Sequence, residues 1–99
     1  MCGIAGILIK AANPMASMHL KKMTDVIAHR GPDGEGQWSN KKNTVLLGHR
    51  RLSIIDLSNN AAQPMSYVNR YQIVHNGEIY NYIEIRSFLQ NKGYNFSTQ

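Results

Sequence analysis

Cysteine is nearly absent from this sequence, because Cys2 is the only one among 99 residues. A single thiol excludes a disulfide within the chain and favours a reducing compartment, so we expect a cytoplasmic protein. Long hydrophobic runs are also absent. The longest, at residues 4–9, is far shorter than the roughly 20 residues that span a bilayer. The N-terminus lacks the basic and long apolar segments of a secretory signal. We therefore expect no membrane partner.

Acidic residues are scarce, since 6 Asp and Glu stand against 11 Lys and Arg and leave a formal net charge of +5. The basic residues form scattered pairs such as Lys21-Lys22, and no aromatic side chains interleave with them as a stacking surface for bases requires. This pattern favours solvated surface charge over nucleic-acid binding. The 4 His and the single Cys lack the spacing of zinc ligands, so we expect no metal site.

The length and the hydrophobic fraction of 42% predict one domain with a modest core. Asn13 followed by Pro14 is typical of a helix start, and Gly93 is typical of a helix end. Hydrophobic periodicity and turn residues predict the remaining elements, with the NKKN segment at 40–43 as a hairpin turn between two strands. The predicted fold class is α+β, with helices at 14–29 and 80–91, strands at 3–9, 37–39, 44–48, 71–75 and from 94 onward, and irregular chain at 52–66.

Three of these elements are expected to supply the core. The strands at 3–9 and 71–75 are apolar enough to be buried. In the first helix, apolar residues recur at near-helical spacing, which favours core packing over a soft metal or cofactor site. These residues are Met15, Met18, Met23, Val26 and Ile27.

Cys2 directly follows the initiator methionine, and this position suggests a nucleophile. Removal of Met1 would leave a cysteine with an α-amine whose pKa of about 7.7–8.0 suits a base that activates the thiol for attack on an amide. Gly3 beside it would let a substrate approach closely. Two alternatives stay open. Cys2 can be a buried structural residue, or it can pair with a histidine, His29, His49 or His75.

An acyl-transfer site also needs donors for the developing oxyanion, and Asn76 with the Gly77 backbone N–H offers them. The alternative is an ordinary Asn-Gly turn after a strand. Arg50 or Arg51 could hold the α-carboxylate of an amino-acid substrate through its guanidinium fork. The alternative is a pair of solvated surface arginines.

Five motifs occur together and in a fixed order, so they are no longer independent signals. Together they resemble the glutamine-hydrolysing asparagine synthetase family. The resemblance is to its class II glutamine amidotransferase domain, an N-terminal-nucleophile hydrolase, and covers residues 2–99. The motifs are Cys-Gly-Ile at 2–4, HRGPDG at 29–34, GHRRLSIIDLS at 48–58, AAQPM at 61–65 and NGEIYNY at 76–82.

The resemblance implies a role for each matching residue. Cys2 would be the nucleophile once Met1 is removed, and Asn76 with Gly77 would form the oxyanion hole. Arg30 would support the loop over the site. The remaining glutamine-binding positions would be Arg51 for the α-carboxylate, together with Leu52, Ile54 and Glu78.

The same resemblance implies a fold and a reaction. The fold would be a four-layer αββα sandwich of two antiparallel sheets. The reaction would hydrolyse the side-chain amide of L-glutamine through a Cys2 thioester and supply ammonia for ATP-dependent amidation of aspartate or a related carboxylate. ATP and Mg are implied only for a synthetase domain, and no cofactor is expected within these 99 residues.

The sequence stops at Gln99, shortly before the family's aspartate for the substrate's ammonium group. We therefore expect residues 1–99 to be a partial domain, without its C-terminal half and without the synthetase domain. An unfinished sheet exposes strand edges and apolar surface, so self-association into a homo-oligomer stays open. A non-catalytic remnant that acts at most as a binding module is the alternative function.

Overall fold

The computed structural model describes residues 2–52 and 62–96. It has a mixed α+β fold with antiparallel sheets, as the sequence predicts. Within the described residues, no helix has the length and apolar character needed to cross a bilayer. In chain order the elements are β1 (Gly3–Leu8), α1 (Ala16–Val26), the 3₁₀ helix η1 (Ala28–Arg30), β2 (Gly34–Ser39), β3 (Val45–Arg51), β4 (Met65–Tyr67), β5 (Tyr71–Ile73) and α2 (Tyr82–Asn91).

The larger sheet has the strand order β1-β3-β2, and both pairings are antiparallel. β2 and β3 form the predicted hairpin, in which the Asn40 side-chain oxygen accepts hydrogen bonds from the backbone N–H groups of Thr44 and Val45. Both strands are longer than predicted. Gly34 and Gly36, which the sequence places in a loop, belong to β2 because they pair with Arg51 and His49 of β3.

Helix α1 covers one face of this sheet and forms the core with it. Its buried residues recur every four positions, at Ala16, Leu20 and Thr24. Leu46 is buried against this stripe. Gly48 allows the close approach, because a Cβ added there would lie 2.6 Å from the Thr24 methyl carbon.

The predicted core role of the methionines is therefore wrong. Met15, Met18 and Met23 are 39–48% exposed, and Val26 is 75% exposed. Leu20 and Thr24 of α1 pack against the sheet at Gly48, which presents no side chain to them, so the three methionines lie on other, more exposed sides of the helix.

The start of α1 also differs from the prediction. Asn13 was expected to cap a helix that begins at Pro14, but the helix begins at Ala16 with Met15 as its N-cap. The Asn13 side chain accepts a 2.9 Å hydrogen bond from the Met15 N–H in a turn before the helix. The helix ends at Val26 and is followed by η1, so the predicted helix to residue 29 is split in two.

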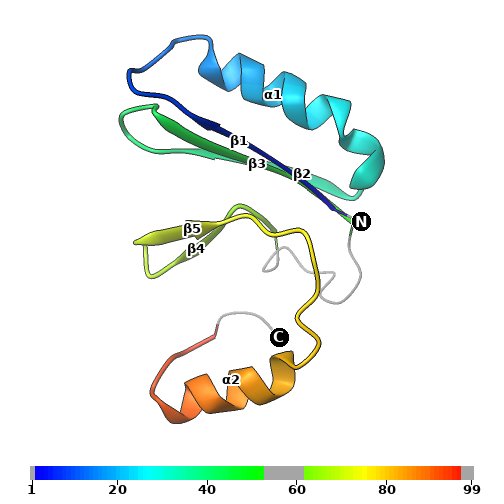
Figure 1. Cartoon of the computed structure of the whole chain (residues 1–99), viewed down its shortest axis with the longest axis vertical. Helices are drawn as coiled ribbons and strands as arrows, with labels where there is room; N and C mark the ends of the chain where they lie inside the picture. The colour runs from blue at the N-terminus through cyan, green and yellow to red at the C-terminus, as the bar shows by residue number, and fades with distance from the viewer. Residues whose placement is uncertain (1, 53–61, 97–99) are drawn as a thin grey trace.

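The elements lie in four layers, in the order α1, the three-stranded sheet, the β4–β5 hairpin and α2 (Figure 1). β4 was not predicted, because it lies in chain that the sequence suggests to be irregular. The strand predicted at 71–75 is shorter and less buried than expected. Tyr71 and Ile73 are 56% and 57% exposed, because within residues 2–52 and 62–96 this sheet consists of β4 and β5 alone.

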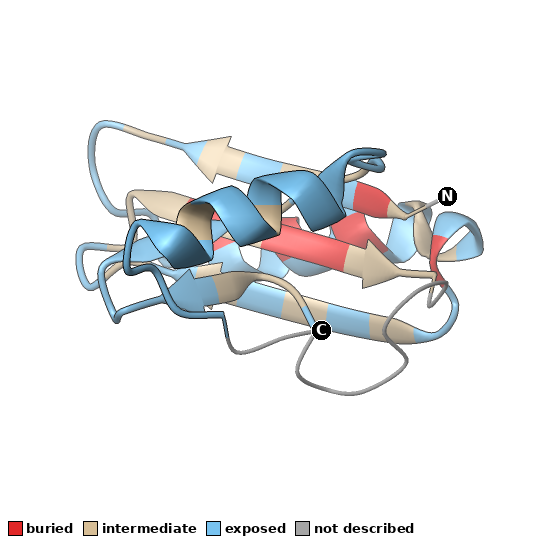
Figure 2. Ribbon diagram, turned by 90° about the horizontal axis from the view of Figure 1, so that it is seen from below, coloured by how far each residue is buried: buried red, intermediate tan, exposed pale blue. Residues whose placement is uncertain are grey.

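Buried residues concentrate where α1 meets the larger sheet (Figure 2). β1 alternates between more and less buried positions, so the expectation of burial on both faces is wrong. Ile4 and Leu8 lie on the face opposite α1 and are 48% and 83% exposed.

Helix α2 ends at Asn91, and Gly93 takes the predicted position just after the helix, with a φ of +96°. The Gly93 N–H donates to the Gln90 carbonyl at 3.0 Å, and the Tyr94 N–H donates to the Leu89 carbonyl at 3.1 Å. These two bonds form a Schellman motif and satisfy the last carbonyls of the helix. Residues 94–96 have no regular secondary structure, so the described part of the predicted last strand is absent.

Candidate active site

Cys2 lies at the N-terminal end of β1, beside the C-terminal end of β3. Gly3 pairs with Arg50, and continuing this antiparallel register by one residue places Cys2 opposite Arg51. The Leu52 N–H donates a 3.2 Å hydrogen bond to the Cys2 Sγ, and the thiol donates to the Leu52 carbonyl at 3.6 Å. The thiol is half-buried and is held by the backbone that follows β3.

Strand alternation places Arg51 and Arg50 on opposite faces of the sheet. Arg50 lies on the α1 side, where its guanidinium pairs with Glu35. Glu35 in turn contacts Lys21 of α1 at 2.9 Å. Arg51 shares the other face with His49. Of the two candidate arginines, Arg50 is therefore engaged beneath the helix, and Arg51 lies on the same face as the Cys2 position opposite it.

The HRGPDG segment is fastened to this end of the sheet. The Arg30 Nε donates a 3.1 Å hydrogen bond to the Cys2 carbonyl, and the Arg50 Nε donates to the Gly31 carbonyl at 3.1 Å. The Asp33 N–H donates to the Arg51 carbonyl at 2.9 Å. A Cβ at Gly31 would lie 2.3 Å from the Arg50 carbonyl carbon, so only glycine permits this approach. Arg30 thus connects the loop directly to the cysteine.

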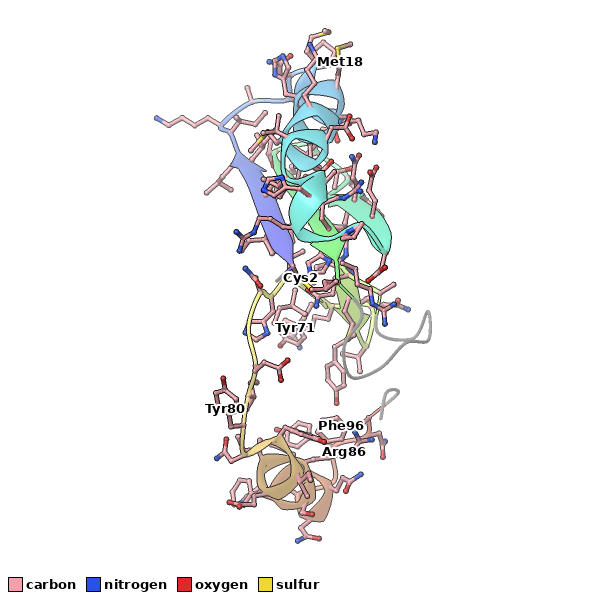
Figure 3. All side chains as sticks on the ribbon, turned by 90° about the vertical axis from the view of Figure 1, so that its right-hand side faces the viewer. Cys2, Met18, Tyr71, Tyr80, Arg86 and Phe96 are labelled. Atoms are coloured by element: carbon pink, nitrogen blue, oxygen red, sulfur yellow. The ribbon has the colours of Figure 1, made fainter. Side chains whose placement is uncertain are left out.

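The segment with Asn76 and Gly77 follows β5 and passes beside the N-terminal end of β1, where Cys2 lies (Figures 1 and 3). The His75 N–H donates a 2.6 Å hydrogen bond to Oε1 of Gln63. The His75 carbonyl lies 3.4 Å from Nε2 of His49. Asn76 is half-buried, and Gly77 is exposed. The two chain regions expected to supply nucleophile and oxyanion donors therefore meet at one end of the larger sheet.

His49 is the most deeply buried ionisable side chain of this region, at 1% exposed. Burial lowers its pKa, and the nearby Arg51 charge acts in the same direction, whereas the contact with the His75 carbonyl opposes it. The ring is therefore neutral at pH 7. Nε2 carries the proton because it faces a carbonyl oxygen. Nδ1 has no hydrogen-bond partner within residues 2–52 and 62–96.

Burial of a neutral His49 predicts that the protein loses stability in acid. Below about pH 6.5 the unfolded chain binds a proton at His49 that the folded chain does not bind. Its contribution to the free energy of unfolding is complete above about pH 6.5 and declines as pH falls toward the lower folded-state pKa. Thermal unfolding at about pH 7.5 and 5.5 measures this, and the midpoint should drop further for the wild type than for His49→Gln. Equal drops would contradict the assignment.

Of the remaining candidate residues, the structure describes Gly3 and Glu78. Gly3 does not open the site to a substrate, since it is buried and an added Cβ would lie 2.8 Å from Ile27 Cδ1. Ile54 lies outside the described residues. Glu78 is exposed just after Gly77. In the described ranges no cluster of three or more His, Cys, Asp or Glu could hold a metal ion.

The Cys-His alternative finds no support in the hydrogen bonds of the described residues. There the Cys2 Sγ is bonded to Leu52, and His49 is directed to the His75 carbonyl. The sequence did not single out His49 and Gln63 as partners of the Asn76 segment. The signal for His49 was a histidine within a strand of otherwise apolar character, at 45–49.

The chain belongs to the family of glutamine amidotransferase domains, since the family model matches residues 1–99. Its relatives include asparagine synthetases. Over 99% of its length it is 46% identical to asparagine synthetase (glutamine-hydrolyzing) 1 of Bacillus subtilis (strain 168). Over 87% of its length it is 41% identical to a putative asparagine synthetase (glutamine-hydrolyzing) 2 of Methanocaldococcus jannaschii.

A third relative has a different name. The chain is 36% identical over 90% of its length to amidase chry2 of Gibberella zeae. The matched regions are only 16%, 20% and 15% of these three relatives, so the chain corresponds to a small part of each. No solved structure matches the chain significantly.

Proposed function

We propose that this chain supplies the glutaminase site of an asparagine-synthetase-type amidotransferase, with Cys2 as its nucleophile. The observation that carries the proposal is the juxtaposition of Cys2 with Arg51 across β1 and β3, with the Asn76 segment passing the same end of the sheet. A nucleophile, a carboxylate-binding guanidinium and oxyanion donors are the parts that hydrolysis of an amino-acid amide needs. The family match to residues 1–99 supports the same reaction.

In the proposed reaction, removal of Met1 gives Cys2 an α-amine that takes the thiol proton. The sulfur attacks the side-chain carbonyl of glutamine, and the oxyanion receives hydrogen bonds from the Asn76 side chain and the Gly77 N–H. The carbon–nitrogen bond breaks as the α-ammonium returns its proton to the leaving nitrogen, which releases ammonia. Water then attacks the thioester and yields glutamate and the original thiol.

Glutamine would be held by the end of β3. Arg51 would pair with its α-carboxylate, and the family resemblance adds Leu52, Ile54 and Glu78 as further glutamine-binding residues. Arg30 acts one step away, because its bond to the Cys2 carbonyl fixes the strand end that carries the thiol.

The larger context is also proposed. The layer order α1, sheet, hairpin, α2 supports a partial αββα N-terminal-nucleophile fold over residues 1–99 (Figure 1). The ammonia would serve an ATP-dependent synthetase domain that amidates aspartate or a related carboxylate, in the cytoplasm. The names of the asparagine synthetase relatives support this context.

Intact mass spectrometry tests the proposal with a glutamine-like diazo-ketone as the probe. We expect the purified chain to lack Met1 and to gain one adduct per molecule, mapped to Cys2 by peptide analysis. Added L-glutamine should slow the labelling, because both compete for the Arg51 site. Cys2→Ala is the matched control and should gain no adduct.

Two outcomes would count against the proposal. Retention of Met1 would block the α-amine and leave Cys2 without its base. A chain that lacks Met1 but is not labelled would have no usable glutamine pocket. Either result would favour a non-catalytic module that retains the motifs of the family.

A further inference from the structure

The peptide group between His75 and Asn76 is held by a contact from the larger sheet. Its oxygen is the His75 carbonyl, which receives the Nε2–H of His49 at 3.4 Å. Its N–H belongs to Asn76. Because a peptide group is planar, fixing the carbonyl direction also fixes the opposite direction, that of the Asn76 N–H. His49 thus restrains the backbone that leads into Asn76 and Gly77.

His49 is well placed to act as a rigid anchor. It lies in the central strand β3, between its cross-strand neighbours Ile4 of β1 and Gly36 of β2. Its ring is almost completely removed from solvent. A side chain locked in this way transmits the position of the sheet to the loop that it contacts.

The preceding peptide group is held by a second contact, from Gln63. The side-chain oxygen of Gln63 accepts a 2.6 Å hydrogen bond from the His75 N–H. Gln63 is itself fixed against β2, because a Cβ at Gly36 would lie 2.0 Å from the Gln63 carbonyl oxygen. The absence of a side chain at Gly36 therefore lets the Gln63 segment lie against the sheet. His75 is bonded through its N–H and its carbonyl to two different parts of the molecule.

We propose that His49 and Gln63 are positioning residues that hold the His75 backbone and thereby place Asn76 and Gly77 over the Cys2 sulfur. The inference rests on the proposed glutaminase function and extends it to two residues that touch neither substrate nor thiol. A misplacement of about 1 Å at a catalytic group can cost roughly 10²-fold in rate. Loss of either hydrogen bond to the His75 backbone should therefore lower turnover. Glutamine binding through Arg51 should change little.

The proposed hydrogen bond to the His75 carbonyl requires an imidazole at His49 that is neutral and carries its proton on Nε2. The charged group on the same strand face is Arg51, which disfavours a second proton on the ring. On the loop side, the contact is the uncharged His75 carbonyl. A glutamine at position 49 can place an amide N–H near the position of Nε2, whereas leucine offers no donor.

Steady-state glutaminase kinetics of the full chain test the inference with four variants. His49→Leu and Gln63→Met remove one hydrogen bond each, and we expect kcat to fall about 10- to 100-fold with KM within about threefold of the wild type. His49→Gln and Gln63→Glu keep the donor and the acceptor, and they should retain kcat within about fivefold. Thermal unfolding of each variant shows whether it is folded at the assay temperature.

The double variant His49→Leu/Gln63→Met adds a test of coupling. Because both residues hold one backbone unit, its loss in kcat should be clearly smaller than the product of the single losses. Equal effects on kcat and KM, or no recovery in either conservative variant, would overturn the positioning role. If His49→Leu fails to fold, the comparison of Gln63→Met with Gln63→Glu tests the positioning role by itself. A wild type whose turnover is absent, or survives Cys2→Ala, would overturn the proposed function itself.

Discussion

Replacing Cys2 with alanine should abolish glutamine hydrolysis while leaving the fold intact. Without the thiol no thioester can form, and removal of an enzymatic nucleophile typically costs on the order of 10⁴-fold or more in kcat. The fold should survive, because Cys2 is half-buried at the end of β1 and its side chain bonds only to the Leu52 backbone within the described residues. Ammonia release from L-glutamine and the thermal unfolding midpoint are the two measurements.

Cys2→Ser separates nucleophilicity from shape. A serine hydroxyl can still accept the Leu52 N–H, but it is a far weaker nucleophile than a thiolate. We expect its turnover to be nearly as low as that of Cys2→Ala, with an unfolding midpoint close to that of the wild type. Normal turnover in Cys2→Ala would show that the proposed mechanism is wrong.

The elements that could be predicted from sequence are those that local chemistry determines. The β2–β3 hairpin follows from a polar turn between two strand-like segments, and the side chain of Asn40 closes that turn. The end of α2 follows from Gly93, since a positive φ after a helix is costly for other residues. These features depend on residues that are close together in the sequence.

The sequence-based predictions fail where packing between segments that are distant in the sequence determines the structure. The spacing of Met15, Met18 and Met23 predicts a helix but cannot say which stripe meets the sheet. Here the choice depends on Gly48, about 30 residues further along the chain, which leaves room on the sheet for Leu20 and Thr24. β4 was missed for the same reason, because its strand conformation depends on pairing with β5.

The candidate site shows the same division. The motifs identify Cys2, Arg51 and the Asn76 segment as candidates, and strand alternation distinguishes Arg51 from Arg50. The contacts of His49 and Gln63 with the His75 backbone could not be predicted, since they join β3 and the AAQPM segment to a third part of the chain. A sequence pattern names residue types, whereas these contacts depend on how three segments meet.

Replacing Asn76 with alanine should lower kcat on the order of 10²- to 10³-fold, the usual cost of removing one oxyanion-hole donor. The effect belongs to the transition state, because the side-chain amide hydrogen-bonds most strongly when negative charge develops on the glutamine oxygen. KM for L-glutamine should therefore stay within about threefold of the wild type. Initial rates of glutamate formation across a range of glutamine concentrations separate the two constants.

Asn76→Asp is the matched control, because it preserves the shape of the side chain but replaces its N–H donor with a carboxylate. An acceptor facing a developing negative charge should be at least as damaging as alanine, even though Asp fills the same space. A loss in Asn76→Ala with near-normal turnover in Asn76→Asp would mean that Asn76 acts by filling space or shaping the turn. The oxyanion role would then fall to other donors. A large rise in KM with unchanged kcat would instead make Asn76 a binding residue for the ground-state substrate.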